Sequence, residues 1–287
     1  MNHGPWPKLN REGGDEVARA TIRGVSLFYS ISGRGVPVVC VHGAWASHRA
    51  WDLVEPHLTE ACQLVRYDRR GHSDSELAAG EDGILEDVAD LAALIEHLDI
   101  GPVWVAGISA GAAVALRLAG ERSELIRGVL AHEPAFFGLL ADDPAHAPSF
   151  AAIQERVGPV VEMIAQGDHA GAAKRFMEGI ALGPGGWETL SPQMQRIFIE
   201  NAPTFANDVS DTESLHFDPA WLQDFAKPIL LTRGELSPPI FEPVVAKLAS
   251  AAERAETQLL AGAGHVPTMT HPEAYANAVK AFVAKHE

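Results

Sequence analysis

The stretch PVWVAGISAGAAVALRL, residues 102–118, decides the fold. Its first part is an apolar run that predicts a buried strand, and its second part predicts a helix. Between the two lies the pentapeptide GISAG (107–111), in which small residues flank Ser109. A sharp strand-to-helix turn needs small residues there because the chain before the serine nearly touches the chain after it. We therefore predict that Ser109 is a nucleophile at the start of a helix, where free N–H groups favour negative charge. The alternative is a tight turn with only a structural role.

Strand and helix patterns alternate on both sides of this turn. Residues 18–33 alternate around a glycine and predict a hairpin, and further strands are predicted at 36–43, 61–68, 102–107, 125–134, 227–235 and 255–262. Apolar residues at helical spacing predict helices at 81–101, 110–121, 241–253 and 272–286. This alternation is typical of an α/β protein, here with a mostly parallel eight-stranded sheet flanked by helices.

The pattern changes after the sixth predicted strand. Residues 136–225 hold helical segments but no convincing strand, so we predict a helical cap inserted at this point. The core then comprises residues 17–135 and 226–287. Residues 1–16 are rich in Gly, Pro and charge and predict a flexible N-terminal arm.

Composition and charge exclude several classes of partner. The 287 residues include 22 Lys+Arg and 38 Asp+Glu, a net charge of −16, whereas nucleic acid and anionic membrane surfaces both require a basic face. The sequence contains no signal-peptide pattern and no long apolar run, so we expect a soluble, cytoplasmic protein, with a secreted mature chain as the alternative. Cys40 and Cys62 fall on neighbouring predicted strands and are expected to be buried thiols rather than a disulfide.

A serine nucleophile needs a base within hydrogen-bond reach. Among the 13 histidines, His265 is the best candidate because it lies in the glycine-rich segment GAGHVP (262–267), directly after the last predicted strand. The carboxyl ends of parallel strands form the edge at which ligands bind in open α/β sheets. We therefore predict that His265 is the general base, and a structural loop histidine is the alternative.

The segment HGAW (42–45) follows the third predicted strand. Acyl transfer needs two N–H donors for the developing oxyanion, one from the residue after the nucleophile and one from this loop. Ala110 and Ala44 occupy those two positions and are the predicted oxyanion hole. Trp45 either forms a wall of the substrate pocket or packs in the core.

Taken together, HGAW, YDRRGHS (67–73), GISAG and GAGHVP resemble the α/β-hydrolase superfamily over residues 18–286, and their order and separations are similar to those of its cofactor-free esterase, haloperoxidase and lactonase branch. This resemblance implies the α/β-hydrolase fold and catalysis with neither metal nor organic cofactor. The charges of YDRRGHS are expected to hold loops together rather than to contact substrate.

The acid that orients the histidine is not in its commonest place. That place is the aspartate of a Gly-Glu-x-Asp segment after the strand that follows the cap, but this chain has Gly-Glu-Leu-Ser with Ser237 at the last position. Glu133, at the end of the sixth predicted strand, is the favoured acid, and Glu235 is the alternative. His-Glu-Pro (132–134) resembles the zearalenone-lactonase group, in which a glutamate at this point completes the triad. A further parallel around Trp187 implies that this residue contacts substrate, although HGAW is the general superfamily type, so the same substrate does not follow.

These residues predict a serine hydrolase that cleaves a carboxylic ester or lactone of an apolar, medium-sized substrate through an acyl-enzyme. A C–C bond hydrolase with the same triad and a non-catalytic ligand-binding protein on the same fold remain alternatives. The expected partner is the small-molecule substrate, and the oligomeric state is open between a monomer and a homodimer.

Overall fold

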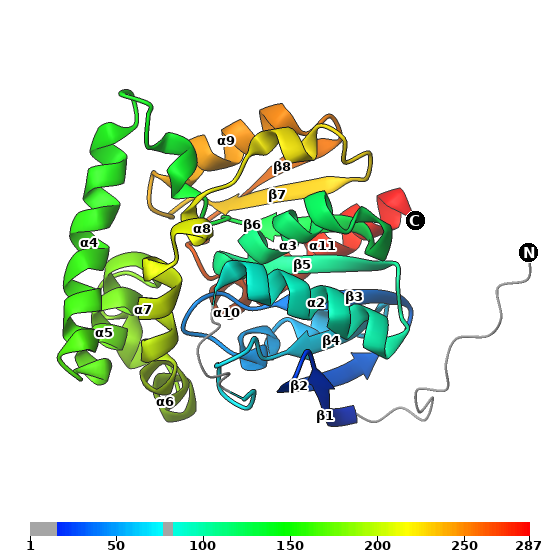
Figure 1. Cartoon of the computed structure of the whole chain (residues 1–287), viewed down its shortest axis with the longest axis horizontal. Helices are drawn as coiled ribbons and strands as arrows, with labels where there is room; N and C mark the ends of the chain where they lie inside the picture. Colours follow the sequence, from blue (N-terminus) through cyan, green and yellow to red (C-terminus); the bar gives the residue numbers. More distant parts are fainter. Residues whose placement is uncertain (1–15, 77–82) are drawn as a thin grey trace, which may run out of the picture.

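A computed structural model of the chain describes residues 16–76 and 83–287, built around one eight-stranded sheet of order β1-β2-β4-β3-β5-β6-β7-β8 (Figure 1). Only β2 runs antiparallel to its neighbours, β1 and β4, and all other pairs are parallel. The predicted sheet is thus confirmed. The strands are β1 (Glu16–Ile22), β2 (Val25–Gly33), β3 (Val36–Val41), β4 (Cys62–Tyr67), β5 (Val103–Ile108), β6 (Ile126–His132), β7 (Ile229–Gly234) and β8 (Ala255–Leu260).

Helices cover both faces of the sheet. Side chains of α2, α3 and α9 join one hydrophobic cluster, and those of α1 and α11 join a second. The elements outside the segment between β6 and β7 are η1 (His48–Trp51), α1 (Glu55–Leu58), α2 (Ile84–Leu98), α3 (Ala110–Glu121), η2 (Ser123–Leu125), α9 (Phe241–Ala251), α10 (Pro267–Thr270) and α11 (Pro272–His286).

Strand β3 illustrates how the sequence specifies two buried faces. Val39 and Val41 belong to the cluster under α2 and α3, whereas Val38 and Cys40 belong to the cluster under α1 and α11. Successive side chains of a strand point to opposite faces, so a strand between two helical layers must be apolar at every position. Cys40 and Cys62 are both buried free thiols on the paired strands β3 and β4, as predicted.

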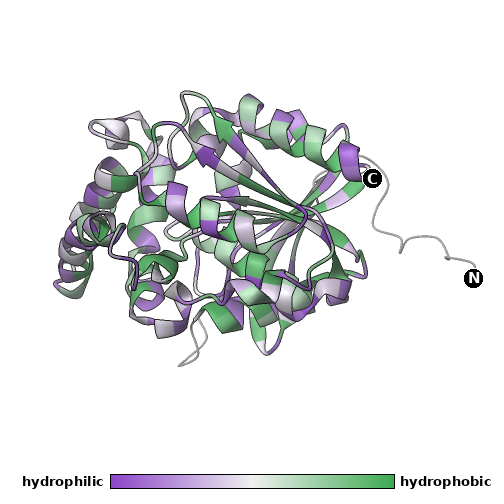
Figure 2. Ribbon diagram, turned by 90° about the horizontal axis from the view of Figure 1, so that it is seen from above, coloured by the Kyte–Doolittle hydropathy of each residue, from purple (hydrophilic) through white to green (hydrophobic). Residues whose placement is uncertain are grey.

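The segment between β6 and β7 is helical throughout its regular elements. Its helices α4 to α7 lie together beyond one end of the sheet (Figure 1), whereas η3 and η6 pack against α9. Polar residues gather on the outward-facing turns of these helices in Figure 2. We call them the inserted helices: η3 (Phe137–Leu140), α4 (Ala147–Ala165), α5 (His169–Phe176), the π-helix η4 (Met177–Ala181), η5 (Gly186–Thr189), α6 (Pro192–Glu200), α7 (Ala202–Ser210), α8 (Thr212–Leu215) and η6 (Pro219–Leu222). The division of the chain into a core and a cap domain stays a prediction.

One buried side chain joins the inserted helices to the loops of the sheet. The amide nitrogen of Asn201, which is 2% exposed, donates to the backbone oxygens of Trp45 at 3.1 Å and Ala46 at 2.8 Å. Its oxygen accepts from the backbone N–H of Ser73 at 2.9 Å. The start of α7 is therefore held against the loops after β3 and β4, because breaking these bonds would leave buried polar groups unpaired.

The charges of the YDRRGHS segment join the loop after β4 to α2. Arg70 donates to Asp90 at 2.7 Å through both Nε and Nη2, and Arg69 donates to Asp87 at 3.0 Å. All four side chains are buried. The two-point pair of Arg70 with Asp90 restricts the loop's geometry more than a single contact would.

The predicted N-terminal arm, residues 1–16, lies outside the described residues except for Glu16. That residue is the first of β1 and pairs with Ile31, so the strand begins two residues before the predicted hairpin and one before the predicted core. Over residues 16–76 and 83–287, none of the helices has the length and apolar character that crossing a membrane requires.

Candidate active site

Ser109 lies on a sharp turn between β5 and α3. Its backbone has φ of 56° and ψ of −118°, a conformation that L-residues rarely adopt. A Cβ on Gly107 would overlap the backbone of Gly111, and one on Gly111 would overlap the carbonyl oxygens of Val41 and His42. Glycine is thus required on both sides of the serine, and the turn presents Ser109 to a cavity above the sheet.

His265 and Glu133 form a buried pair next to this turn. Nδ1 of His265 lies 2.6 Å from Oε2 of Glu133, and the two residues are 4% and 0% exposed. The other carboxylate oxygen, Oε1, accepts from the backbone N–H of Gly234 at 2.7 Å. Because Nδ1–H donates to the carboxylate, Nε2 of the neutral ring is left as a proton acceptor.

The environment keeps Glu133 ionised. Burial, the largest single influence, would raise the pKa of this carboxyl. The hydrogen bond from His265, the proximity of His132 and His265, and the hydroxyl of Ser237 together outweigh that effect, so the pKa lies below its ordinary value. Glu133 also has a positive φ of 47°, and its N–H donates to the carbonyl oxygen of Thr232 at 3.0 Å. A fixed negative charge therefore lies directly behind the imidazole.

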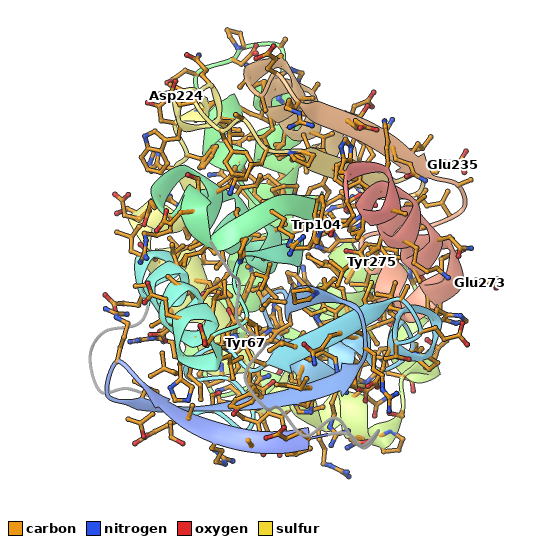
Figure 3. All side chains as sticks on the ribbon, turned by 90° about the vertical axis from the view of Figure 1, so that its right-hand side faces the viewer. Tyr67, Trp104, Asp224, Glu235, Glu273 and Tyr275 are labelled. Atoms are coloured by element: carbon orange, nitrogen blue, oxygen red, sulfur yellow. The ribbon has the colours of Figure 1, made fainter. Side chains whose placement is uncertain are left out.

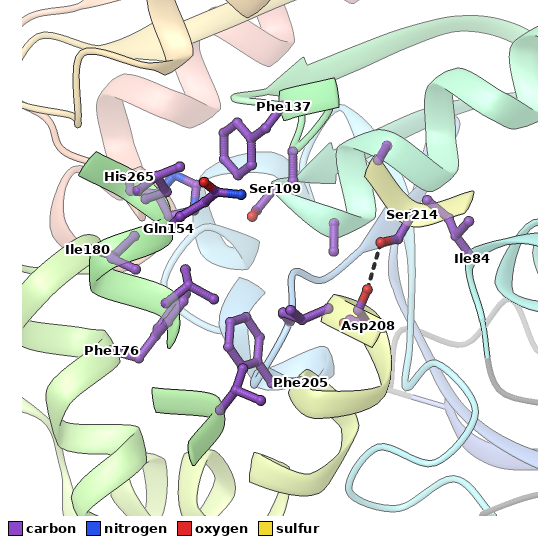
Figure 4. A pocket seen from close by; sticks show the side chains of 18 of the residues that line it. Ile84, Ser109, Phe137, Gln154, Phe176, Ile180, Phe205, Asp208, Ser214 and His265 are labelled. Carbon is purple, nitrogen blue, oxygen red and sulfur yellow. Dashed lines mark hydrogen bonds between the residues drawn. The ribbon is translucent and has the colours of Figure 1, made fainter. Parts of the chain in front are cut away.

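Ser109 and His265 line the same cavity, as Figure 4 shows. The ring of Phe241 stacks on the imidazole of His265 with centroids 4.6 Å apart and an interplanar angle of 17°. This stacking and the bond to Glu133 restrict the orientation of the ring. The structure thus brings together Ser109, His265 and Glu133, three residues that the sequence places up to 156 positions apart.

Glu235, the alternative acid, lies elsewhere. Its side chain is exposed, its Oε2 accepts from the N–H of Gly262 at 2.8 Å, and Figure 3 shows it at the periphery of the molecule. The hydroxyl of Ser237 is buried beside Glu133 and contributes to lowering the pKa of that carboxyl. The carboxylate in contact with His265 is therefore Glu133.

Ala44 and Ala110 both line the cavity beside Ser109. A Cβ on Gly43 would lie 3.1 Å from the carbonyl oxygen of Ile108, so the loop after β3 packs closely on the serine turn. Ala110 begins α3, and the first N–H groups of a helix have no partner within the helix. The two predicted oxyanion donors thus lie on adjoining segments at the nucleophile.

The two tryptophans that the sequence suggested as substrate contacts are not among the residues that line the cavity. Trp45 is 0% exposed and packs against Phe176 and Phe205, at centroid distances of 5.1 Å and 4.8 Å. Those two phenylalanines do line the cavity, so Trp45 supports its wall from behind. Trp187 is 8% exposed and packs in the hydrophobic cluster that also includes side chains of α1 and α11. Burial of large apolar area accounts for both positions, and contact of either tryptophan with substrate stays a prediction.

The cavity has a volume of about 510 Å³ and lies between the sheet and the inserted helices. Its polar lining residues are Ser109, His265, Arg69, Gln154, Asp208 and Ser214. Most of the remaining wall is apolar, including Phe137, Phe150, Ile153, Phe176, Ile180 and Phe205. A cavity of this size suits a medium-sized organic molecule.

Two groups of side chains place potential metal-ligand atoms within 4.8 Å of one another among the described residues. One consists of His132, Glu133 and His265, and the other of His48, Asp68 and Asp74. In the first, His265 is hydrogen-bonded to Glu133, and in the second Nδ1 of His48 lies 2.9 Å from Asp68. Both groups are thus accounted for by hydrogen bonds between their own members.

Comparison with known proteins agrees with this geometry. A family model described as "Alpha/beta hydrolase family" matches residues 38–278. The chain belongs to the alpha/beta hydrolase family. A pimeloyl-[acyl-carrier protein] methyl ester esterase from Methylococcus capsulatus is 31% identical to this alpha/beta hydrolase over 278 residues, covering 91% of this chain and 99% of that protein.

Two further similarities have a narrower scope. An uncharacterized hydrolase, YraK, from Bacillus subtilis is 31% identical over 121 residues, which are 42% of this chain and only 45% of that protein. A thermophilic esterase from Thermogutta terrifontis superposes with a TM-score of 0.75 at 20% identity, over 94% of this chain and 99% of that one. The latter supports the predicted alpha/beta hydrolase fold.

Several residues of the site in this alpha/beta hydrolase were not foreseen from its sequence. Asp208 and Ser214 reach the cavity from α7 and α8, and Arg69 reaches it from the loop after β4. His132 is fully buried beside Glu133, with Nδ1 2.9 Å from the hydroxyl of Thr232. The segment YDRRGHS was a visible signal for Arg69, whereas the inserted helices carry no motif that marks Asp208 or Ser214.

Proposed function

We propose that this alpha/beta hydrolase is a serine hydrolase that cleaves a carboxylic ester or lactone of an apolar, medium-sized substrate through an acyl-enzyme. The observation that carries the proposal is that Ser109 shares a cavity with His265, whose Nδ1 is bonded to the buried carboxylate of Glu133. A nucleophile, a base and an orienting acid in this arrangement are the requirements for acyl transfer by a serine.

The reaction proceeds in two halves. In the first, Nε2 of His265 takes the proton of Ser109 Oγ while that oxygen attacks the carbonyl carbon of the ester. The tetrahedral intermediate then collapses, the bond to the alcohol oxygen breaks, and His265 returns the proton to that oxygen. In the second half a water molecule gives its proton to His265 and attacks the acyl-enzyme, which releases the acid and restores Ser109.

The backbone of the site supplies the remaining stabilisation. The N–H groups of Ala44 and Ala110 are the donors for the negative oxygen of each tetrahedral intermediate, and the positive end of α3 adds to this effect. Each such donor contributes about a hundredfold or more to the rate in comparable enzymes. The charge of Glu133 stabilises the imidazolium that forms on His265 in each step.

The substrate class is supported by the cavity and the relatives. An apolar wall around a volume of about 510 Å³ suits a hydrophobic acyl or alcohol group. The Methylococcus relative is named for a methyl ester, and the Thermogutta structure is titled an esterase. A triad glutamate after β6 is the feature of the zearalenone-lactonase group, and it extends the proposal to lactones.

The test combines covalent labelling with turnover. A fluorophosphonate probe is expected to label the wild-type protein on Ser109 and to leave Ser109→Ala unlabelled, with the exposed Ser123→Ala as a matched control. A panel of methyl esters and macrocyclic lactones then measures turnover. If Ser109 is labelled, no panel member is hydrolysed and a vinylogous diketone is cleaved, the protein is a C–C bond hydrolase instead. Absence of label on Ser109 in the folded wild type would refute the hydrolase proposal.

A further inference from the structure

One polar side chain of the cavity has no role in the proposed chemistry. Gln154, on α4, lines the cavity together with Ser109 and His265. Its side-chain amide makes no hydrogen bond to the protein within residues 16–76 and 83–287. A carboxamide has two N–H donors and an acceptor oxygen, so Gln154 is able to bond to a molecule in the cavity.

The other polar lining residues outside the triad are bonded to the protein. Arg69 donates to Asp87 at 3.0 Å and to Asp208 at 3.1 Å. The hydroxyl of Ser214 donates to the backbone oxygen of Asp208 at 2.6 Å. A polar group on a ligand therefore meets Gln154 without competing with a bond that the protein already makes. The few polar groups of an apolar cavity are the ones that orient its ligand.

Gln154 lies where the cavity opens to solvent. Among the described residues that line the cavity, only Gln154 and Gly158 are exposed, and both belong to α4. In Figure 4 Gln154 lies on the same side of Ser109 as His265. The amide is thus at the opening, on the side of the general base.

This placement assigns the two halves of an ester to different parts of the cavity. His265 returns its proton to the leaving alcohol, so the alcohol departs on the side of His265. That is also the side of Gln154. The acyl half then faces the opposite part of the wall, where Phe205 and Ile84 lie. An apolar acyl group is therefore enclosed, and the alcohol lies next to an amide and to water.

We propose that the substrate is an ester of an apolar acid with an alcohol that carries a second hydroxyl group, and that this hydroxyl bonds to the amide of Gln154. The inference rests on the proposed function and adds the class of alcohol. A hydroxyl both donates and accepts a hydrogen bond, and so does a carboxamide. An ammonium group only donates and a carboxylate only accepts, and the neutral amide balances neither charge.

The experiment compares esters of hexanoic acid with diols of two to four carbons. Each hydroxyalkyl ester is paired with the alkyl ester in which a methyl group replaces the hydroxyl. kcat/KM, which covers the steps up to departure of the alcohol, is measured by titration of the released acid. Each value is divided by the rate constant for alkaline hydrolysis of the same ester, which removes the intrinsic difference between the two alcohols.

We expect the corrected ratio of hydroxyalkyl to alkyl ester to reach about threefold to tenfold for at least one pair. One neutral hydrogen bond contributes about that much. Loss of the methyl group should cost little, because apolar burial is small where the cavity is open to solvent.

Variants locate the effect on α4. Gln154→Met replaces the amide by an apolar group of similar length, so the ratio should fall to near one. Gln166→Met removes an exposed amide at the end of the same helix that does not line the cavity, and should leave the ratio unchanged. Gln154→Glu adds a negative charge and should raise kcat/KM for the cationic ester of dimethylaminoethanol about threefold, as an exposed ion pair does. Thermal melts verify that each variant is folded.

The outcomes separate this inference from the proposed function. Hydrolysis of the alkyl esters that is lost in Ser109→Ala supports the proposed function alone. A ratio near one for every pair in the wild type, a high ratio that survives Gln154→Met, or no gain on the cationic ester in Gln154→Glu overturns the inference. An equal fall for both esters of a pair in Gln154→Met also overturns it, because Gln154 would then assist the reaction rather than select the alcohol.

Discussion

Replacement of Glu133 by Gln tests the orienting acid, and the structure specifies what the change does. Oε1 of Glu133 accepts from the backbone N–H of Gly234 at 2.7 Å, so the amide oxygen of the introduced glutamine is held on that N–H. The amide N–H₂ must then face Nδ1 of His265, where Oε2 now lies at 2.6 Å. Nδ1 becomes an acceptor and the proton moves to Nε2, which is the nitrogen that should receive the proton of Ser109.

Two losses add up to the expected effect. The charge-assisted hydrogen bond contributes about 1.5–3 kcal/mol, or roughly tenfold to a hundredfold. The wrong tautomer adds to this, and the corresponding Asp→Asn change in a serine protease triad lowers kcat by about 10⁴. We expect Glu133→Gln to lower kcat on the best ester by on the order of 10³–10⁴, with KM much less affected.

The assay is steady-state hydrolysis of that ester, with a urea titration to verify folding. Glu235→Gln is the matched control and should stay within a few-fold of wild type, because Glu235 is exposed and its Oε2 accepts from the N–H of Gly262. Adding Ser237→Asp to Glu133→Gln should recover about tenfold or more, since residue 237 adjoins residue 133. Activity of folded Glu133→Gln within tenfold of wild type would refute this account.

Three further predictions concern stability. Burial raises the pKa of Asp87 from 3.8 to about 7, so between these values the folded state binds more protons and the free energy of unfolding falls as pH rises. In urea titrations, Asp87→Asn should therefore reduce the loss of stability between pH 5 and pH 8 by up to about 3 kcal/mol. Asn201→Ala leaves buried backbone groups unpaired and should lower the free energy of unfolding by roughly 2–5 kcal/mol, whereas the exposed Asn277→Ala should change it by less than about 1 kcal/mol. Gly111→Ala places a Cβ against the carbonyl oxygens at the end of β3 and should prevent recovery of folded protein. Gly179→Ala has open space around its Cβ and should be tolerated, and a thermal melt of each purified variant provides the comparison.

The elements that local pattern determines were predicted from the sequence. The sheet, its flanking helices and the helical segment after β6 follow from periods of two and 3.6 residues and from glycine positions. Ser109 and Glu133 could be named because each directly follows a strand, and His265 because it lies in the loop after the last strand; the ends of neighbouring parallel strands meet at one edge. The contact of Glu133 with His265 needed only strand order as additional information.

The remaining features depend on how the inserted helices sit on the sheet. Asp208 meets Arg69 across 139 positions of sequence, and no local pattern specifies that distance. The sequence could not decide whether Trp45 lines the pocket or packs in the core, because it gives the size of a side chain but not how far that side chain lies from the cavity. Trp187 is buried as well, since both rings have the apolar area that favours burial.

The backbone bonds at the strand ends have a consequence for how such a protein can change over evolutionary time. The N–H of Ser109 donates to the carbonyl oxygen of His132 at 2.9 Å, and the N–H of Glu133 donates to that of Thr232 at 3.0 Å. The nucleophile and the acid thus follow the ends of two neighbouring strands, and the spacing between strands sets their separation. Mutations that reshape the inserted helices can alter which molecules bind while the reacting groups keep their relative positions. Substrate preference can therefore change during evolution without a change in the reaction.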